Sequence, residues 1–171
     1  TNKRVIKIDS SYDYKDSKYW EDVNRSLKYK FQSTIEGIIS SEPNKRFSIF
    51  PLAPIPLIIK LGYLFGDKKT IDIYQKFREP NSWSWQSEDE TNKFEVRKIT
   101  RNENNKIAII LSVSSMIDIN RIIKVDNFGI VYHLQAEECS VNAIKSLQDL
   151  ECFWQKYLEM LDIIKNSDSV N

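Results

Sequence analysis

The stretch that decides the fold is FSIFPLAPIPLIIKLGYLFGDKKTIDIYQK, which runs from Phe47 to Lys76. It predicts a buried strand over 47–50, a loop with prolines, an apolar helix that ends near Phe65, and a second strand over 70–75. An apolar run of this length between turn signals is typical of a layered α/β core. Proline is tolerated in the first turn of a helix, because the N–H that it lacks would have no partner there.

The loop between the first of these strands and the helix contains Pro51, Leu52, Ala53 and Pro54. It places backbone N–H groups at the N-terminus of the predicted helix, and this end of a helix attracts anions. We therefore expect the loop to contact a phosphate.

The sequence before this stretch predicts a strand over 5–9 and then a long amphipathic helix. The apolar face of that helix recurs at three- and four-residue spacing and carries Trp20, Val23, Leu27, Phe31, Ile35 and Ile38. A strand–helix–strand connection of this length implies parallel neighbours with the helix on one face of the sheet.

The sequence after residue 90 predicts more strands. Segments 94–99 and 106–111 are expected to pair across a turn at 102–105, and 129–134 is another strand. The apolar strand at 107–111 runs into Ser112, Val113, Ser114 and Ser115 and then a short helix, which repeats the plan of the decisive stretch.

The last helix has a clear start signal. Ser146 and Asp149 have the spacing of a capping box, with aspartate in the acidic position. The apolar positions that follow are Leu147, Leu150, Trp154, Tyr157, Leu161 and Ile164. We predict one α/β domain over 1–166, with a mainly parallel sheet and helices on both faces, and a disordered tail over 167–171.

The composition and the net charge indicate the class of protein and the partners that it can attract. The 171 residues are 41% hydrophobic and 29% charged, which fits a globular domain. A net charge of +1 predicts no strong attraction to long nucleic acid or to a membrane, so any phosphate site must be local. Cys139 and Cys152 make no disulfide framework, and we see no signal peptide, so the expected compartment is the cytoplasm.

Common catalytic and cofactor motifs are missing from the sequence. Its 4 glycines form neither GxGxxG nor GxxxxGK[ST], and His133, the only histidine, makes no recognisable metal site with the distant cysteines. We expect no metal and no cofactor, and a structural role for His133. Without a GxSxG elbow, a nucleophilic serine after strand 107–111 is disfavoured. Capping of the next helix and phosphate binding both remain open for Ser112, Ser114 and Ser115.

Two tryptophans, Trp83 and Trp85, lie in a polar segment beside Gln75, Lys76 and Arg78. One interpretation is that the indoles cover the core, since tryptophan is usually largely buried. The other is that they stack on a base while a cation holds a phosphate.

Position favours the second interpretation. Ligands of parallel α/β sheets bind outside the carboxyl ends of the strands. Four candidate sites follow predicted strands: Ser10, the 51–54 loop, the 75–76 pair and the 112–115 loop.

Three segments resemble the SAVED domain of bacterial antiphage systems. They are FPLAPIPLIIKLGYLFGDKKTIDIYQKFREPNSWSWQ from Phe50, IAIILSVSSMIDINRI from Ile107, and NAIKSLQDLECFWQKYLEMLDII from Asn142. The similarity runs from about Val5 to Ile164 and keeps its order, so it is more specific than any single motif.

The resemblance implies a CARF-like, Rossmann-type unit that senses a cyclic oligonucleotide in CBASS or type III CRISPR defence and switches on an effector. The family usually continues with a second unit, so this chain resembles one half of a SAVED sensor. We expect the other wall of the cleft to come from a second copy, as in a homodimer, or from an effector or second SAVED half.

The expected function is recognition of a cyclic oligoadenylate-type second messenger and signalling to an effector partner. Loop N–H groups would bind phosphates, and Lys76, Arg78 or Arg121 would add positive charge. Two alternatives stay open: a ring nuclease that uses Ser112, Ser114 and Lys76, and an adaptor subunit that binds no ligand.

Overall fold

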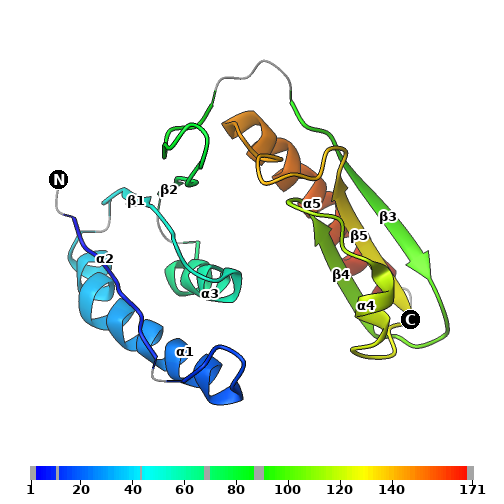
Figure 1. Cartoon of the computed structure of the whole chain (residues 1–171), viewed down its shortest axis with the longest axis horizontal. Helices are drawn as coiled ribbons and strands as arrows, with labels where there is room; N and C mark the ends of the chain where they lie inside the picture. The colour runs from blue at the N-terminus through cyan, green and yellow to red at the C-terminus, as the bar shows by residue number, and fades with distance from the viewer. Residues whose placement is uncertain (1–2, 11, 43, 68–69, 87–90, 169–171) are drawn as a thin grey trace. The chain divides into compact units, whose positions relative to one another are not determined.

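The computed structural model describes residues 3–10, 12–42, 44–67, 70–86 and 91–168. The chain divides into two compact units, Thr1–Ser84 and Trp85–Asn171, which we call the N-terminal and C-terminal units. Each unit has its own β-sheet (Figure 1).

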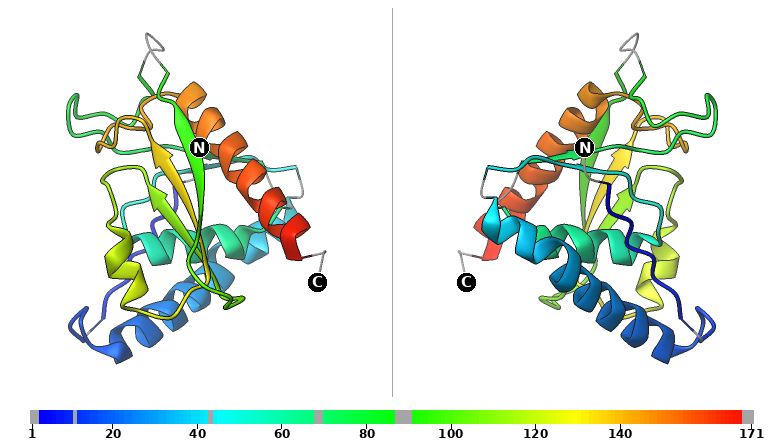
Figure 2. Two further views of the ribbon diagram at one scale, coloured as in Figure 1. Left: turned by 90° about the vertical axis from the view of Figure 1, so that its right-hand side faces the viewer. Right: turned by 90° about the vertical axis from the view of Figure 1, so that its left-hand side faces the viewer.

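The N-terminal unit begins with one long helical segment. It consists of α1 (Ser17–Phe31), a π-helical turn η1 (Gln32–Glu36) and α2 (Gly37–Ser41), which follow one another without a break (Figure 2). Asp16 caps α1 by accepting a 2.9 Å hydrogen bond from the Lys18 N–H. The buried side is made of Val23, Leu27, Phe31 and Ile35, as predicted, whereas Trp20 is 38% exposed.

The decisive stretch forms the predicted parallel connection. β1 (Phe47–Ile49) leads through α3 (Ile55–Phe65) to β2 (Ile71–Ile73), and the two strands pair in parallel. Gly66 ends α3 with a φ of 60°, which glycine adopts at low cost, and its N–H donates to the Gly62 carbonyl at 3.1 Å.

The strand predicted over 5–9 is wrong. Residues 3–10 form neither helix nor strand. Ile6 and Ile8 instead pack beside Val23, Leu27 and Leu57, so these side chains gain their burial against helices. Alternation of apolar residues shows which side chains seek burial, but not whether the backbone has a strand partner.

The C-terminal unit contains β3 (Phe94–Thr100), β4 (Ile107–Ser112) and β5 (Ile130–Ala136) in the order β3-β5-β4. The predicted pairing of the first two strands is wrong, because β5 lies between them, antiparallel to β3 and parallel to β4. β5 is buried along most of its length and therefore takes the central position, which requires apolar side chains on both faces.

Helices cover both faces of this sheet. α5 (Leu147–Asp168) packs on one face around Tyr132 and Leu134, and α4 (Ile119–Ile123) lies on the other with Ile110 and Val131 (Figures 1 and 2). At the start of β5, Gly129 approaches the Asn104 backbone so closely that a Cβ atom would collide with it.

The described residues thus form a mixed α/β structure with one small parallel sheet and one small mixed sheet. The Rossmann-like, mainly parallel sheet is not confirmed, because strand 5–9 is absent and β3 is antiparallel. The single domain over 1–166 stays a prediction. α5 continues to Asp168, beyond the start of the predicted tail, and 169–171 lie outside the described residues.

Candidate functional site

Three aromatic side chains meet where β1 and β2 end. Phe50 directly follows β1 and Tyr74 directly follows β2, and the Tyr74 N–H extends the ladder by donating to the Ile49 carbonyl at 2.9 Å. The Phe50 and Tyr74 rings stack with centroids 4.5 Å apart and planes 9° apart. Trp83 meets Phe50 edge-to-face at 5.4 Å. We call Phe50, Tyr74 and Trp83 the aromatic cluster.

A cation lies beside this cluster. Lys76 Nζ is 5.6 Å from the centroid of the Trp83 ring, and it also donates to Asn81 Oδ1. The loop between these residues is anchored by Phe77, whose side chain is 1% exposed and whose N–H donates to the Ser82 carbonyl at 2.8 Å. This anchored loop brings Lys76 and Trp83 together, so an aromatic face and an ammonium group are available at one place.

The loop from Pro51 to Pro54 joins the aromatic cluster to α3. Pro54 is the N-cap of α3, and Leu52 is 78% exposed. Proline has no N–H, and the N–H groups of Leu57 and Ile58 donate to the Pro54 carbonyl at 2.9 and 3.3 Å. The other N–H groups of this loop and the first helical turn belong to Leu52, Ala53 and Ile55. The N-terminal unit therefore places helix-terminal donors, a cation and aromatic rings next to the carboxyl ends of two parallel strands.

The second predicted loop follows β4 in the C-terminal unit. Ser112 is fully buried; its Oγ accepts a 3.0 Å hydrogen bond from the Ile117 N–H and lies 2.7 Å from His133 Nε2. Ser114 and Ser115 are exposed. The N-cap of α4 is Asp118, so capping by these serines is not the role that the structure gives them.

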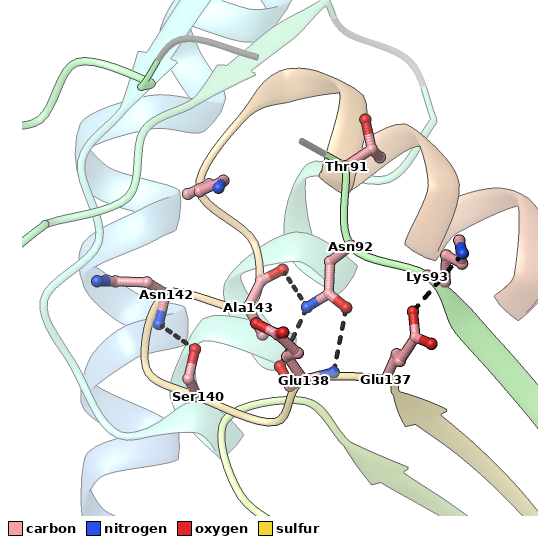
Figure 3. A pocket seen from close by; sticks show the side chains of 9 residues that line it. Thr91, Asn92, Lys93, Glu137, Glu138, Ser140, Asn142 and Ala143 are labelled. Carbon is pink, nitrogen blue, oxygen red and sulfur yellow. Dashed lines mark hydrogen bonds and ion pairs between the residues drawn. The ribbon is translucent and has the colours of Figure 1, made fainter. Parts of the chain in front are cut away.

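A polar pocket of about 370 Å³ lies at the carboxyl end of β5 and the amino end of β3 (Figure 3). The Asn92 side chain joins its walls, because Nδ2 donates to the carbonyls of Glu138 and Ala143, both at 3.1 Å. The lining residues are Thr91, Asn92, Lys93, Glu137, Glu138, Ser140, Asn142, Ala143 and Lys145. No motif in the sequence marks this pocket, since two segments distant in the chain form it.

The Asp149 side chain joins two residues that line this pocket, Asn92 and Lys145. Its carboxylate is fully buried and accepts hydrogen bonds from the N–H groups of Asn92, Lys145 and Ser146 at 2.8–3.0 Å. Burial acts to raise the pKa of Asp149, but the hydrogen bonds from these three N–H groups and the Ser146 hydroxyl outweigh it and lower the pKa. The Asp149 N–H donates to Ser146 Oγ at 3.0 Å, so the predicted capping box is confirmed.

The family model of the SAVED domain, the "SMODS-associated and fused to various effectors sensor domain", matches residues 27–171. The chain belongs to the SAVED family. It is therefore a sensor domain of the kind that is fused to effectors of antiphage defence. A search of curated proteins found no match.

In this SAVED domain, several predicted ligand contacts come together in the N-terminal unit. The segments that follow β1 and β2 contain seven of them: Pro51, Leu52, Ala53, Pro54, Gln75, Lys76 and Trp83. Phe50 and Tyr74 were missed by the sequence analysis. The available signal was that each directly follows a strand of the parallel pair.

The other predicted contacts lie elsewhere. Ser10 Oγ donates to Asp22 Oδ2 on α1 at 2.9 Å, and Arg78 is exposed on the loop after Phe77. Trp85 begins the C-terminal unit, where the next residue's N–H donates to the Lys145 carbonyl at 2.9 Å. Ser112, Ser114, Ser115 and the exposed Arg121 of α4 belong to the C-terminal unit.

Two further observations concern the part of the SAVED chain that the structure describes. No helix there is long and apolar enough to cross a bilayer. No cluster of three or more histidine, cysteine, aspartate or glutamate side chains there could hold a metal ion.

Proposed function

We propose that this SAVED domain binds a cyclic oligonucleotide of the oligoadenylate type at the carboxyl ends of β1 and β2, and signals its presence to an effector partner. The observation that carries the proposal is the aromatic cluster with Lys76 beside it. Family membership supports a sensor role, and the position supports ligand binding, because ligands of parallel α/β units bind at this edge.

Each part of a nucleotide has a chemical partner at this edge. A base can stack on an aromatic face, a contact that is worth about 1–3 kcal/mol per base. A phosphate can accept hydrogen bonds from N–H groups near the start of α3 and interact with the Lys76 ammonium group. Ser114, Ser115 and Arg121 are a second set of proposed contacts, on the C-terminal unit.

The binding assay uses cyclic tri-adenylate and cyclic tetra-adenylate, followed by chromatography of the nucleotide. We expect retention of one of the two rings with the ring intact. Single-stranded DNA serves as a competitor and should not displace the ring, because a net charge of +1 gives no general attraction to polyanions. Linear products would instead identify the ring nuclease alternative, and no retention of either ring would favour the adaptor.

The ring nuclease alternative uses Ser112, Ser114 and Lys76 to position a ribose 2′-hydroxyl for attack on its own phosphate. Ser112 does not suit this role, because the residue is fully buried and its Oγ already interacts with the Ile117 N–H and with His133 Nε2. Ser114 is exposed, so the search for linear products decides this alternative.

The phosphate contact is tested by Ala53→Asp, with Ala53→Asn as the matched control. Both side chains have nearly the same size, and Ala53 is exposed in a loop, so neither should disturb the fold. We expect the aspartate to abolish binding of cyclic tetra-adenylate through charge repulsion and the asparagine to retain it. Equal affinities of the two variants would show that no phosphate lies near the 51–54 loop.

A further inference from the structure

His133 and Ser112 form a buried hydrogen-bonded pair that the proposed ligand contacts do not use. His133 lies in β5 and is 8% exposed, and its Nε2 is 2.7 Å from Oγ of the fully buried Ser112 at the end of β4. The same Oγ accepts a hydrogen bond from the Ile117 N–H at 3.0 Å. A short chain of hydrogen bonds therefore joins the turn after β4 to the centre of the sheet.

The number of hydrogens on Ser112 and His133 decides which group donates and which accepts in this series of hydrogen bonds. A serine hydroxyl has one hydrogen to donate, and in Ser112 it needs an acceptor because the group is buried. Ser112 Oγ receives the Ile117 N–H, and among the described residues His133 Nε2 is the one acceptor recorded for its own hydrogen, so this hydrogen points to Nε2. Nε2 can accept only when it carries no proton. The ring is therefore neutral, with its proton on Nδ1.

The second ring nitrogen, His133 Nδ1, makes none of the hydrogen bonds recorded for the described residues, and the ring faces Ser112 through Nε2. In the neutral ring, Nδ1 carries the proton and Nε2 accepts from the Ser112 hydroxyl.

We propose that neutral His133 is a positioning residue that holds the turn from Ser112 to Asp118 through the Ser112 hydroxyl, and that protonation of His133 releases this turn. Protonation converts Nε2 into a donor. Ser112 Oγ would then face two N–H donors, and its own hydrogen would lose the acceptor that it has now. The oxygen can accept from both donors, but the Ser112 hydrogen must turn away from the ring and find another acceptor, and this change loosens the turn.

Ser114 and Ser115, which are proposed ligand contacts, lie within this turn. The effect of His133 on ligand binding rests on the proposed function, whereas its effect on the turn does not.

The charges around His133 favour the neutral ring. Arg97 lies directly opposite His133 on β3 and is ion-paired with Glu95 at 2.9 Å. β4 contributes no titratable side chain, and the α4 residue Arg121 is exposed. After β5, the Cys139 thiol donates to the Ser112 carbonyl at 3.3 Å.

Burial lowers the pKa of His133 below its ordinary value of 6.5, and the Arg97 charge lowers the pKa further. The stabilisation from the neutral ring is therefore fully present above pH 6.5 and is lost as the pH falls through the lowered pKa.

Nuclear magnetic resonance of the unmodified chain tests the inference directly, because His133 is the only histidine. Long-range ¹H–¹⁵N correlation of the ring reports the tautomer, and a pH titration reports its midpoint. We expect the Nδ1–H tautomer at neutral pH, a midpoint below 6.5, and loss of Ile117 amide protection through the same midpoint. An Nε2–H tautomer, or an Ile117 amide indifferent to that midpoint, would overturn the proposal.

A pair of variants connects the switch to the ligand. His133→Gln places an amide oxygen that does not titrate near the position of Nε2, whereas Ser112→Ala removes the hydroxyl and leaves the histidine. Affinity for cyclic tetra-adenylate is measured about one pH unit above and about one pH unit below the midpoint that the nuclear magnetic resonance titration gives.

We expect the unmodified chain to lose affinity several-fold at the lower pH. The affinity of His133→Gln should be the same at both pH values. Ser112→Ala should bind weakly at both values. The same pH profile in the unmodified chain and in His133→Gln would contradict the effect on binding. If no ring is bound at any pH, the proposed function fails, and the tautomer and the Ile117 amide still decide the role of His133.

Discussion

Trp83 and Trp154 differ in their surroundings, although both are partly accessible to solvent. The Trp83 and Phe50 rings meet edge-to-face, and the Lys76 ammonium group lies 5.6 Å from the centroid of the Trp83 ring. Trp154 lies on α5, is 53% exposed and stacks against Tyr157 at 5.8 Å. Only the first combines an aromatic face with a cation at the carboxyl end of a parallel strand pair.

Replacing Trp83 by alanine tests whether the indole stacks on a base. We expect Trp83→Ala to weaken binding of cyclic tetra-adenylate by about 1–3 kcal/mol. Trp154→Ala is the control, since it removes a tryptophan of α5 that is none of the proposed ligand contacts. Titration calorimetry and thermal unfolding are measured on both variants. A lower melting temperature for Trp83→Ala with unchanged affinity of the folded fraction would assign Trp83 to the core instead.

Single residues also show where sequence reasoning stops. Trp83 and Lys76 were recognised because an indole and a cation are conspicuous in a polar segment. Phe50 and Tyr74 each end an apolar strand, and their contact depends on the parallel register that places both strand ends together. That register is a property of the pair of strands, which the local sequence of either strand does not contain.

The start of α5 shows how one carboxylate can organise an element. Asp149 is fully buried and accepts from the Ser146 hydroxyl and from N–H groups that include those of Asn92 and Lys145. It therefore caps α5 and also fixes the segment that leads into β3. Loss of its charge leaves several buried donors with a poorer acceptor, which is costly inside a protein.

We expect Asp149→Asn to lower the free energy of unfolding by about 1–3 kcal/mol. Asp162→Asn, on an exposed position of the same helix, is the matched control and should change it little. Because the pKa of Asp149 is lowered from 3.8, its contribution is fully present above that pH and lost as the pH falls through the lowered pKa. Urea unfolding at several pH values measures this, and a constant difference between Asp149→Asn and the unmodified chain down to the lowest pH would contradict it.

Elements with local signals were predicted well, and the pairing of strands was not. The capping box marked α5, apolar spacing marked α1, and an apolar run after prolines marked α3, because helices are stabilised by contacts between residues near in sequence. β3 and β4 were both expected, but they were paired with each other across a short turn. β5 intervenes because its side chains are apolar on both faces, and this advantage appears only when all three strands compete for the centre.

At the scale of the whole molecule, the family and the α/β class could be predicted from the order of motifs along the chain. The extent of the sheet could not, because it depends on which strand edges meet. The two units therefore carry the predicted loops separately, with the 51–54 loop in the N-terminal unit and the 112–115 loop in the C-terminal unit. Contacts that depend on local sequence were accessible to prediction, and contacts between distant segments were not.

The symmetry of the proposed ligand leads to a prediction about assembly. A cyclic tetra-adenylate repeats the same phosphate and base around its ring, whereas one chain offers a single 51–54 loop and a single Lys76 beside its aromatic cluster. A two-fold dimer presents the same residues on both sides of its axis and so matches a ring of even symmetry. We expect the SAVED domain to dimerise, or to pair with a partner chain, and the ring to tighten the dimer through mass action.

Analytical ultracentrifugation with and without cyclic tetra-adenylate measures this, and the expected stoichiometry is one ring per two chains. Ala53→Asp provides the control: it should sediment like the unmodified chain without ligand and fail to respond to the ring. A chain that binds one ring as a monomer would contradict dimerisation and leave the binding site itself in place, because the ring would then be held by the contacts of a single copy.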